Sequence, residues 1–216
     1  GFRVAASGET DFPCMSGERV GIGRVYAKVD GRLSFSKWVQ SIGTGRSYVS
    51  DGLCHLLDFS GTSPRGQSVV RVGEKGSELR VSAGEKLKFS VRAAARLEGS
   101  PQLPVELIVN GFPVDTGHLR ADGSMREIAF ETKFDRSAWV AMRVFPNAHT
   151  NPIYVVVDDK PVRGSVDSFR WCLAGVNQCW KSKQKLYAAA EQDDAKAAYD
   201  HAREIYSQLI KEAAED

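Results

Sequence analysis

Cysteine, histidine and long apolar runs are scarce in this chain, and each shortage excludes a class of protein. The 216 residues include four cysteines and four histidines. Four scattered cysteines without a Cys-x-x-Cys pair form neither a disulfide-rich scaffold nor a zinc or thioredoxin-type motif. No run approaches the roughly 20 apolar residues of a membrane-spanning helix, and the first residues lack the basic and apolar regions of a signal peptide. We therefore expect a soluble chain of unknown compartment.

An excess of charge of either sign is also missing. The 29 Lys and Arg residues face 27 Asp and Glu residues, which gives a formal net charge of +2. Such a small charge supplies no field that would attract nucleic acid or an anionic membrane, so we expect neither as a partner. The length allows one to three compact units. The chain begins with Gly1 rather than methionine, as expected of a piece cut from something longer.

The cysteines predict little covalent cross-linking. Cys172 and Cys179 lie seven residues apart in a helical pattern, which separates them by about 10 Å and exceeds the reach of a disulfide. A bridge between Cys14 and Cys54 is geometrically allowed. Buried free thiols are the favoured alternative, because cysteine is among the most buried residue types.

Residues 1–62 have a mixed pattern of strand, loop, strand, helix and strand. Arg24–Val29 alternates, with Val25, Ala27 and Val29 on one side, and is typical of a strand. Ser34 is a predicted N-cap for a helix. The apolar residues of that helix recur at helical spacing, namely Phe35, Trp38, Val39 and Ile42.

The remainder predicts two further domains. The turn-rich stretch 61–66 marks a boundary, and about eight strand-like runs follow before residue 161, with Asn110-Gly111 as a hairpin turn. We interpret residues 63–164 as an Ig-like antiparallel β-sandwich. Beyond Ser165 the period changes to helical, so residues 165–216 are predicted to form a helical hairpin packed on the sandwich. The predicted class is α+β and mainly β.

Two helical stripes define the faces that this hairpin is predicted to bury. The residues of the first helix are Phe169, Trp171, Cys172, Val176, Cys179 and Trp180. Those of the second are Ala195, Ala198, Ala202, Ile205, Tyr206, Leu209 and Ala213.

Acidic residues near the start are the first candidate ligands for a metal. Glu9 and Asp11 follow a short apolar run, a position at which α/β barrels keep catalytic residues. His55, after the Asp51-Gly52 turn, is a third candidate. A hydrolytic divalent-metal site needs three or more converging ligands and an open position for water. The sequence offers no second acidic and histidine-rich cluster, so the site is expected to be incomplete, and the metal stays unidentified.

The other histidines favour structural roles. His118 is predicted in a turn, His149 as a hydrogen-bonded brace of its loop, and His201 on a solvated helix. Three arginines near the site edge have two interpretations, binding of an anionic ligand or surface pairing with carboxylates. They are Arg19, Arg24 and Arg46.

Three sequence motifs, in residues 6–11, 45–52 and 148–155, together resemble the C-terminal half of the CehA/McbA-type metallohydrolases of the PHP superfamily. The resemblance spans most of residues 1–158. It implies a distorted β/α barrel that carries divalent metal ions and is followed by a β-sandwich. Residues 1–62 would then be the last part of that barrel, Asp11 would match its last metal-binding aspartate, and Pro13 would replace the motif's histidine.

Three functions compete at this stage. The first is the C-terminal region of a metal-dependent hydrolase, inactive alone because most ligands would lie upstream of Gly1. The alternative is a non-catalytic Ig-like module that binds carbohydrate or a protein partner. The third is a degenerate relative with a structural role. An edge strand left by a missing barrel would be capped by an upstream barrel segment or by a second copy of the chain, which predicts a homodimer.

Overall fold

The computed structural model describes residues 3–10, 20–64 and 68–215. The chain divides into two compact units, one ending at Val162 and one beginning at Arg163. This division lies close to the predicted boundary at residue 164. The predicted boundary at residue 62 lies inside the first unit.

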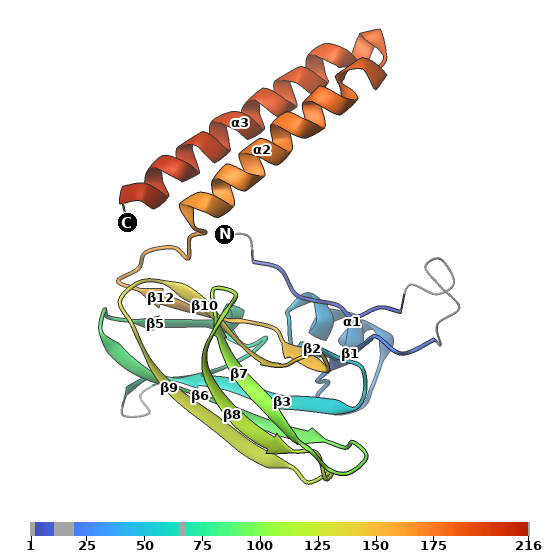
Figure 1. Cartoon of the computed structure of the whole chain (residues 1–216), viewed down its shortest axis with the longest axis vertical. Coiled ribbons are helices and arrows are strands. Elements are labelled where there is room, and N and C mark those ends of the chain that lie inside the picture. The colour runs from blue at the N-terminus through green and yellow to red at the C-terminus, as the bar shows by residue number, and fades with distance from the viewer. Residues whose placement is uncertain (1–2, 11–19, 65–67, 216) are drawn as a thin grey trace. The chain divides into compact units, whose positions relative to one another are not determined.

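The first unit is a sandwich of two sheets (Figure 1). Most neighbouring strands are antiparallel, and β12 and β5 run parallel. The larger sheet has the order β1-β2-β11-β10-β12-β5, with β7 paired to β10 and β8 to β7, and the smaller has the order β4-β3-β6-β9. The larger sheet contains β1 (Arg24–Ala27), β2 (Ser47–Ser50), β5 (Glu78–Val81), β7 (Gln102–Val109), β8 (Phe112–Arg120), β10 (Ala138–Val144), β11 (Ala148–Thr150) and β12 (Ile153–Val157). The smaller contains β3 (Cys54–Thr62), β4 (Val69–Arg71), β6 (Glu85–Ala95) and β9 (Arg126–Phe134).

The core lies between the two sheets. On β6, Leu87, Phe89, Val91 and Ala93 are at most 1% exposed, as the alternation of that strand predicts. The Phe89 ring lies 6.2 Å from that of Phe59 and 5.9 Å from that of Phe134. The predicted mainly β, Ig-like sandwich is therefore confirmed.

The turn-rich stretch near residue 62 connects two paired strands rather than two domains. Thr62 of β3 pairs with Val69 of β4, and the amide of Ser63 donates to the carbonyl of Ser68 at 2.9 Å. The strands before this turn also belong to the sandwich, because β2 pairs with β11 and β3 with β6. Turn formers occur in hairpins as well as at domain boundaries, so the predicted boundary at residue 62 is wrong.

The Asn110-Gly111 hairpin is confirmed, since Val109 and Phe112 pair across it. The prediction that His118 lies in a turn is wrong, because residue 118 belongs to β8 and pairs with Pro104. Gly117 makes this stretch look like a turn, but the structure requires glycine here for packing. A Cβ atom there would lie 3.3 Å from the side chains of Ile128 and Phe130, so glycine admits a close approach between the sheets.

Helix α1 (Phe35–Gly43) begins at its predicted N-cap, where the Ser34 hydroxyl accepts from the amide of Lys37. Short 3₁₀ turns occur at Lys75–Ser77 in the first unit, and at Gln184–Leu186 and Ala189–Glu191 in the second.

The second unit pairs α2 (Val166–Lys183) with α3 (Gln192–Glu215). Ser165 caps α2 as predicted, accepting from the amide of Ser168 at 3.1 Å. Aromatic rings join the helices, with Trp180 and Tyr199 centred 5.1 Å apart. No described helix is long and apolar enough to cross a membrane. The predicted packing of this hairpin on the sandwich stays a prediction.

Three residues of the predicted helical stripes do not face the other helix. Trp171 is 78% exposed, Ile205 is 42% exposed, and Ala198 is also exposed. Each lies about 100° around the helix from a less exposed neighbour, because successive residues advance by that angle. For Ala198 and Ile205 these neighbours are Tyr199 and Tyr206, and for Trp171 it is Cys172.

Candidate functional site

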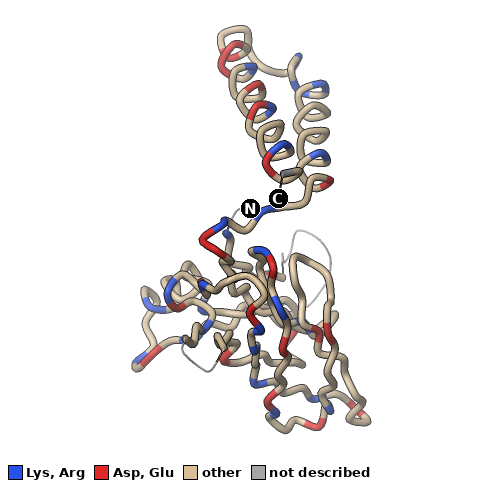
Figure 2. The backbone as a smooth tube through the Cα atoms, turned by 90° about the vertical axis from the view of Figure 1, so that its left-hand side faces the viewer, with Lys and Arg blue, Asp and Glu red and all other residues tan. Residues whose placement is uncertain are grey.

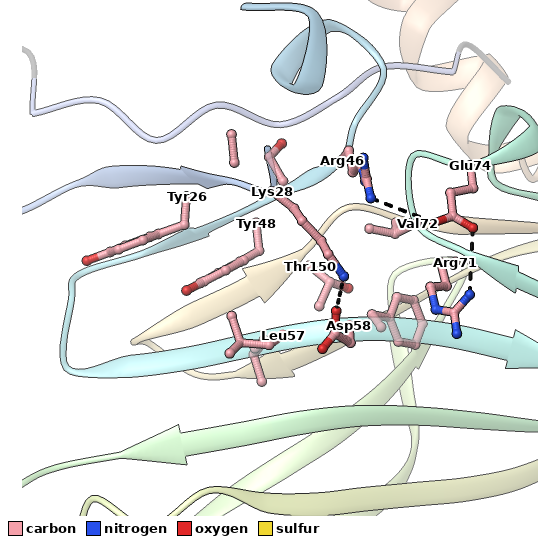
Figure 3. Close-up of a pocket in the computed structure, with 14 residues that line it drawn as sticks. Tyr26, Lys28, Arg46, Tyr48, Leu57, Asp58, Arg71, Val72, Glu74 and Thr150 are labelled. Atoms are coloured by element: carbon pink, nitrogen blue, oxygen red, sulfur yellow. Dashed lines mark hydrogen bonds and ion pairs between the residues drawn. The ribbon is translucent and has the colours of Figure 1, made fainter. Parts of the chain in front are cut away.

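A cavity of about 360 Å³ opens between the β1–β2 end of the larger sheet and β3 of the smaller one (Figure 3). Its size falls within the range of small-molecule sites in proteins. The larger sheet contributes Tyr26, Lys28, Arg46, Tyr48 and Thr150. The opposite side is formed by residues 56–59 of β3, and the segment that follows β4 completes it with Arg71, Val72 and Glu74.

Strand alternation explains why these side chains converge. Tyr26 and Lys28 are two residues apart and so are Arg46 and Tyr48, which places each pair on one face of the pleat. The amide of Lys28 donates to the carbonyl of Arg46 at 2.9 Å, so β1 and β2 stay paired beyond Ala27. The apolar residues Val25, Ala27 and Val29 alternate with Tyr26 and Lys28 along the strand. The opposite, polar side lines the cavity.

Two stacked tyrosines form one wall. Tyr26 and Tyr48 are directly paired across β1 and β2, and their rings are nearly parallel, with centroids 5.1 Å apart. The Tyr48 hydroxyl lies 2.7 Å from Nδ1 of His55. Burial raises the pKa of Tyr48, which keeps the hydroxyl protonated, and the tautomer of His55 decides whether this hydroxyl donates to Nδ1 or accepts from it. His55 also meets the Tyr26 ring edge-on at 5.0 Å, so it supports the tyrosine pair.

The floor is apolar and the rim is charged. Leu56 and Phe59 are buried beneath the tyrosines, with Leu57 and Val72 beside them. At the rim Nζ of Lys28 lies 2.5 Å from a carboxylate oxygen of Asp58. The cavity therefore combines an apolar interior with polar groups at its opening.

Ion pairs continue from the rim into an adjoining groove of about 460 Å³. Asp58 also accepts a hydrogen bond from Arg92 at 3.3 Å. The guanidinium of Arg46 donates to both carboxylate oxygens of Asp30. Arg46 and Arg71 each lie 3.9 Å from a different oxygen of Glu74. The groove is lined by four cations and four carboxylates, so it carries no net charge: Lys28, Arg46, Arg71, Arg92, Asp30, Asp58, Glu74 and Glu127.

A β-bulge places Asp58 at this junction. The pairing of β3 with β6 shifts register between Leu57 and Ser60, and Asp58 adopts a left-handed conformation with φ of 56°. Bulges re-aim side chains and occur often beside functional sites. The hydrogen bond from Lys28, with further help from Arg92, lowers the pKa of Asp58, and Arg46 lowers that of Asp30. Both carboxylates therefore remain ionised at neutral pH.

The residues predicted to bind metal are placed as follows. Glu9 is exposed and accepts from the Ser7 hydroxyl at 2.5 Å, while His55 bonds Tyr48. Asp11 lies outside the described residues. Within residues 3–10, 20–64 and 68–215 no group of three or more His, Cys, Asp or Glu residues is arranged to hold a metal ion. The predicted divalent-metal site stays a prediction.

The predicted free thiol at Cys54 is present and buried. Burial raises the pKa of Cys54 to about 12, so it remains a thiol at neutral pH. Its predicted alternative partner, Cys14, lies outside the described residues. Of the three arginines noted in the sequence, Arg46 pairs with Asp30 and Glu74, and Arg24 bonds the Tyr26 hydroxyl at 3.2 Å. Arg19 is also outside the described part.

His149 makes a hydrogen-bond contact as predicted, with Nδ1 2.6 Å from the carbonyl oxygen of Thr150, but it lies in strand β11 rather than in a loop. Burial, with a smaller contribution from Arg143, lowers its pKa below the ordinary 6.5. The unfolded chain therefore takes up this proton at a higher pH than the folded chain does. We expect His149 to make the unfolding free energy fall as the pH drops below about 6.5.

Urea titrations between pH 7.5 and 5 would measure this effect. His149→Gln is expected to reduce the fall of the unfolding free energy between pH 7.5 and 5. His201→Gln, at an exposed helical position, is expected to leave that fall unchanged. Parallel curves for wild type and His149→Gln would contradict the assignment.

Comparisons with known proteins add a likeness to solved structures. No family model matches the chain, and no curated protein matches it. Among solved structures, the fibronectin(III)-like modules of Clostridium thermocellum CbhA are similar, at 21% sequence identity and a TM-score of 0.23. The match covers 40% of this chain and 91% of that one. At this TM-score the likeness carries no argument about the site.

Proposed function

We propose that this chain is a non-catalytic binding module, and that the cavity beside Tyr26 and Tyr48 takes a neutral sugar ring. The observation that carries the proposal is an apolar, tyrosine-walled cavity whose charged rim side chains are held in ion pairs. A pyranose has the matching chemistry, because its C–H groups form apolar faces and its hydroxyls surround the edge. Tyrosine suits such a contact, since it offers an apolar ring and a polar tip.

The balance of charge favours a neutral ligand. Lys28 and Arg92 share Asp58, and Arg46 and Arg71 share Glu74. A cationic ligand would compete with two cations for each of these carboxylates, and an anionic ligand would compete with Asp58, Glu74 and Asp30 for the cations. Hydroxyl groups both donate and accept, so a sugar can bond these side chains while the pairs persist. Cationic and acidic positions are likewise interspersed along the chain (Figure 2).

The reactive side chains next to the cavity lining support binding rather than catalysis. The Tyr48 hydroxyl and Nδ1 of His55 are bonded to each other, and the Cys54 thiol is buried. The hydrolase origin inferred from the CehA/McbA resemblance is a separate proposal, since it rests on Asp11 as a metal ligand. The two proposals differ in one measurable respect, because sugar binding here needs no metal.

Isothermal titration with neutral monosaccharides and disaccharides would test the module. We expect at least one neutral sugar to bind equally well with and without EDTA, and to be recovered unchanged. Tyr26→Ala is expected to weaken binding about tenfold or more, through loss of the stacking wall.

Tyr154→Ala provides the matched control. Tyr154 is a half-buried tyrosine outside the cavity, where the Arg3 guanidinium lies 4.5 Å from its ring centre. Its replacement is expected to leave sugar affinity unchanged. The proposal fails if no neutral sugar saturates the protein, if Tyr26→Ala binds like wild type, or if glucuronate binds more tightly than glucose.

A further inference from the structure

The tyrosine-walled cavity and the adjoining groove share one rim. The side chains that line both of them are Lys28, Arg46, Asp58, Arg71 and Glu74. In Figure 3 the ion pair of Lys28 with Asp58 lies between the two tyrosines and Glu74. A ligand that rests against the tyrosines therefore meets the groove directly beyond these charged groups, and the two spaces form one continuous site.

Beyond this rim the groove follows the outward face of the smaller sheet. Ser90 and Arg92 alternate along β6 with core residues that are at most 1% exposed, so both point outward. Ser60 of β3 pairs directly with Ser90. Glu127 of β9 pairs directly with Arg92. Since β3, β6 and β9 are neighbouring strands (Figure 1), the groove crosses all three.

The groove offers hydrogen-bonding groups and no aromatic wall. The hydroxyls of Ser60 and Ser90 lie 3.2 Å apart, and both residues are half-buried. Asp58 accepts from Lys28 at 2.5 Å and from Arg92 at 3.3 Å. A carboxylate can accept about four hydrogen bonds and a guanidinium can donate about five, so such pairs keep capacity for a ligand. None of the described residues that line the groove is aromatic.

We propose that the ligand is an oligosaccharide of neutral sugars, with one ring in the tyrosine-walled cavity and the next ring in the groove. This inference rests on the proposed function and extends it from one ring to two. The first ring meets the tyrosine wall with its C–H face. The second ring meets donors and acceptors alone, and many of these are charged, which makes their bonds to hydroxyls stronger than those between neutral groups.

The sizes of the two spaces agree with this division. At about 360 Å³ the cavity lies near the lower end of the range for small-molecule sites, and the groove adds about 460 Å³. A single ring in the cavity leaves the groove to water. A chain that is longer by one ring replaces this water with its own hydroxyls, while the ion pairs at the rim persist. The equal numbers of cations and carboxylates in the groove favour an uncharged second ring.

Titration calorimetry with a monosaccharide that binds, and with the disaccharide and trisaccharide built from it, tests the proposal. The disaccharide is expected to bind about tenfold more tightly than the monosaccharide, through its hydrogen bonds in the groove. The trisaccharide is expected to bind about as tightly as the disaccharide, because the cavity and the groove together hold two rings.

Two variants remove groups that line the groove and not the cavity. They are Glu127→Ala and the double variant Ser60→Ala/Ser90→Ala, in which neither serine is left without the other. Each is expected to reduce the gain of the disaccharide over the monosaccharide to about threefold or less and to leave monosaccharide affinity unchanged. Glu131→Ala is the matched control. Glu131 is exposed on the same strand as Glu127 and pairs with Lys86 outside both spaces, so this variant is expected to keep the full gain.

Amide chemical shifts locate the second ring independently. The signals of Ser90 and Glu127 are expected to move with the disaccharide and not with the monosaccharide. The inference is overturned, and the proposed function stands, if the monosaccharide binds through Tyr26 but the disaccharide binds no more tightly. The same holds if both groove variants keep the full gain, or if Glu131→Ala loses it equally. If no neutral sugar binds, the proposed function itself fails and this inference fails with it.

Discussion

Replacing Asn151 with leucine is expected to lower the free energy of unfolding by about 3 kcal/mol. Asn151 is 2% exposed, and its side chain joins three separate segments. Nδ2 donates to the carbonyls of Gly45 and Ser47 at 3.2 and 3.0 Å and to the Ser47 hydroxyl at 2.9 Å, while Oδ1 accepts from the amide of Ala6 at 2.7 Å. Leucine fills a similar volume but satisfies none of these groups.

Urea unfolding followed by tryptophan fluorescence would measure this loss. The comparison variant is Asn147→Leu, whose side chain donates to Asp51 at 2.6 Å in a half-buried position. We expect it to lose about 1 kcal/mol, in proportion to its single side-chain bond. Hydrogen exchange gives a second readout, since Asn151→Leu should deprotect the amide of Ala6. Equal losses in the two variants would show that Asn151 does not join these segments.

Features that depend on neighbouring residues could be predicted from the sequence. The alternation of β6, the Asn110-Gly111 turn and the caps at Ser34 and Ser165 are local patterns with direct physical causes. The place of residues 24–62 in the sandwich is different. It depends on pairing of β2 with β11, which is about 100 residues later in the chain, and no local signal encodes it.

The candidate site was missed for the same reason. His55 resembles a ligand when it is considered alone, and it becomes a support for Tyr48 only when β2 and β3 are placed in space. A β-bulge turns Asp58 toward Lys28 and Arg92, and no local sequence pattern predicts this bulge. A weak signal was available, because two polar or aromatic pairs at two-residue spacing, Tyr26 with Lys28 and Arg46 with Tyr48, would share a face if their strands were paired.

Helix α1 illustrates a further limit. Its period predicted an apolar stripe, and such a stripe usually faces the core, yet Phe35 is 78% and Val39 45% exposed. Which side of a helix meets the protein depends on its connections, here the contacts of Ser41 with Lys28 and Arg46. Periodicity therefore establishes that a stripe exists without establishing what covers it.

Substituting Gly73 by alanine is expected to cost about 3 kcal/mol or more of unfolding free energy and to open the rim of the sugar cavity. Gly73 has φ of +80°, and a Cβ atom there would lie 2.4 Å from Cβ and 2.5 Å from Cα of Arg46. Neither atom can move without moving β2. The segment after β4 must therefore shift away, which separates Glu74 from Arg46 and weakens one of the pairs at the rim.

Gly76→Ala separates the two causes of this cost. Gly76 also has a positive φ, of +65°, but a Cβ atom there meets nothing within 4 Å. Its replacement is expected to cost about 1 kcal/mol, the conformational penalty alone, and to leave sugar affinity unchanged. Gly73→Ala should bind sugar about tenfold more weakly under conditions in which it is still folded. If the two variants were equally stable, the close approach of Gly73 to Arg46 would not hold the cavity together, and the rim would depend on its ion pairs instead.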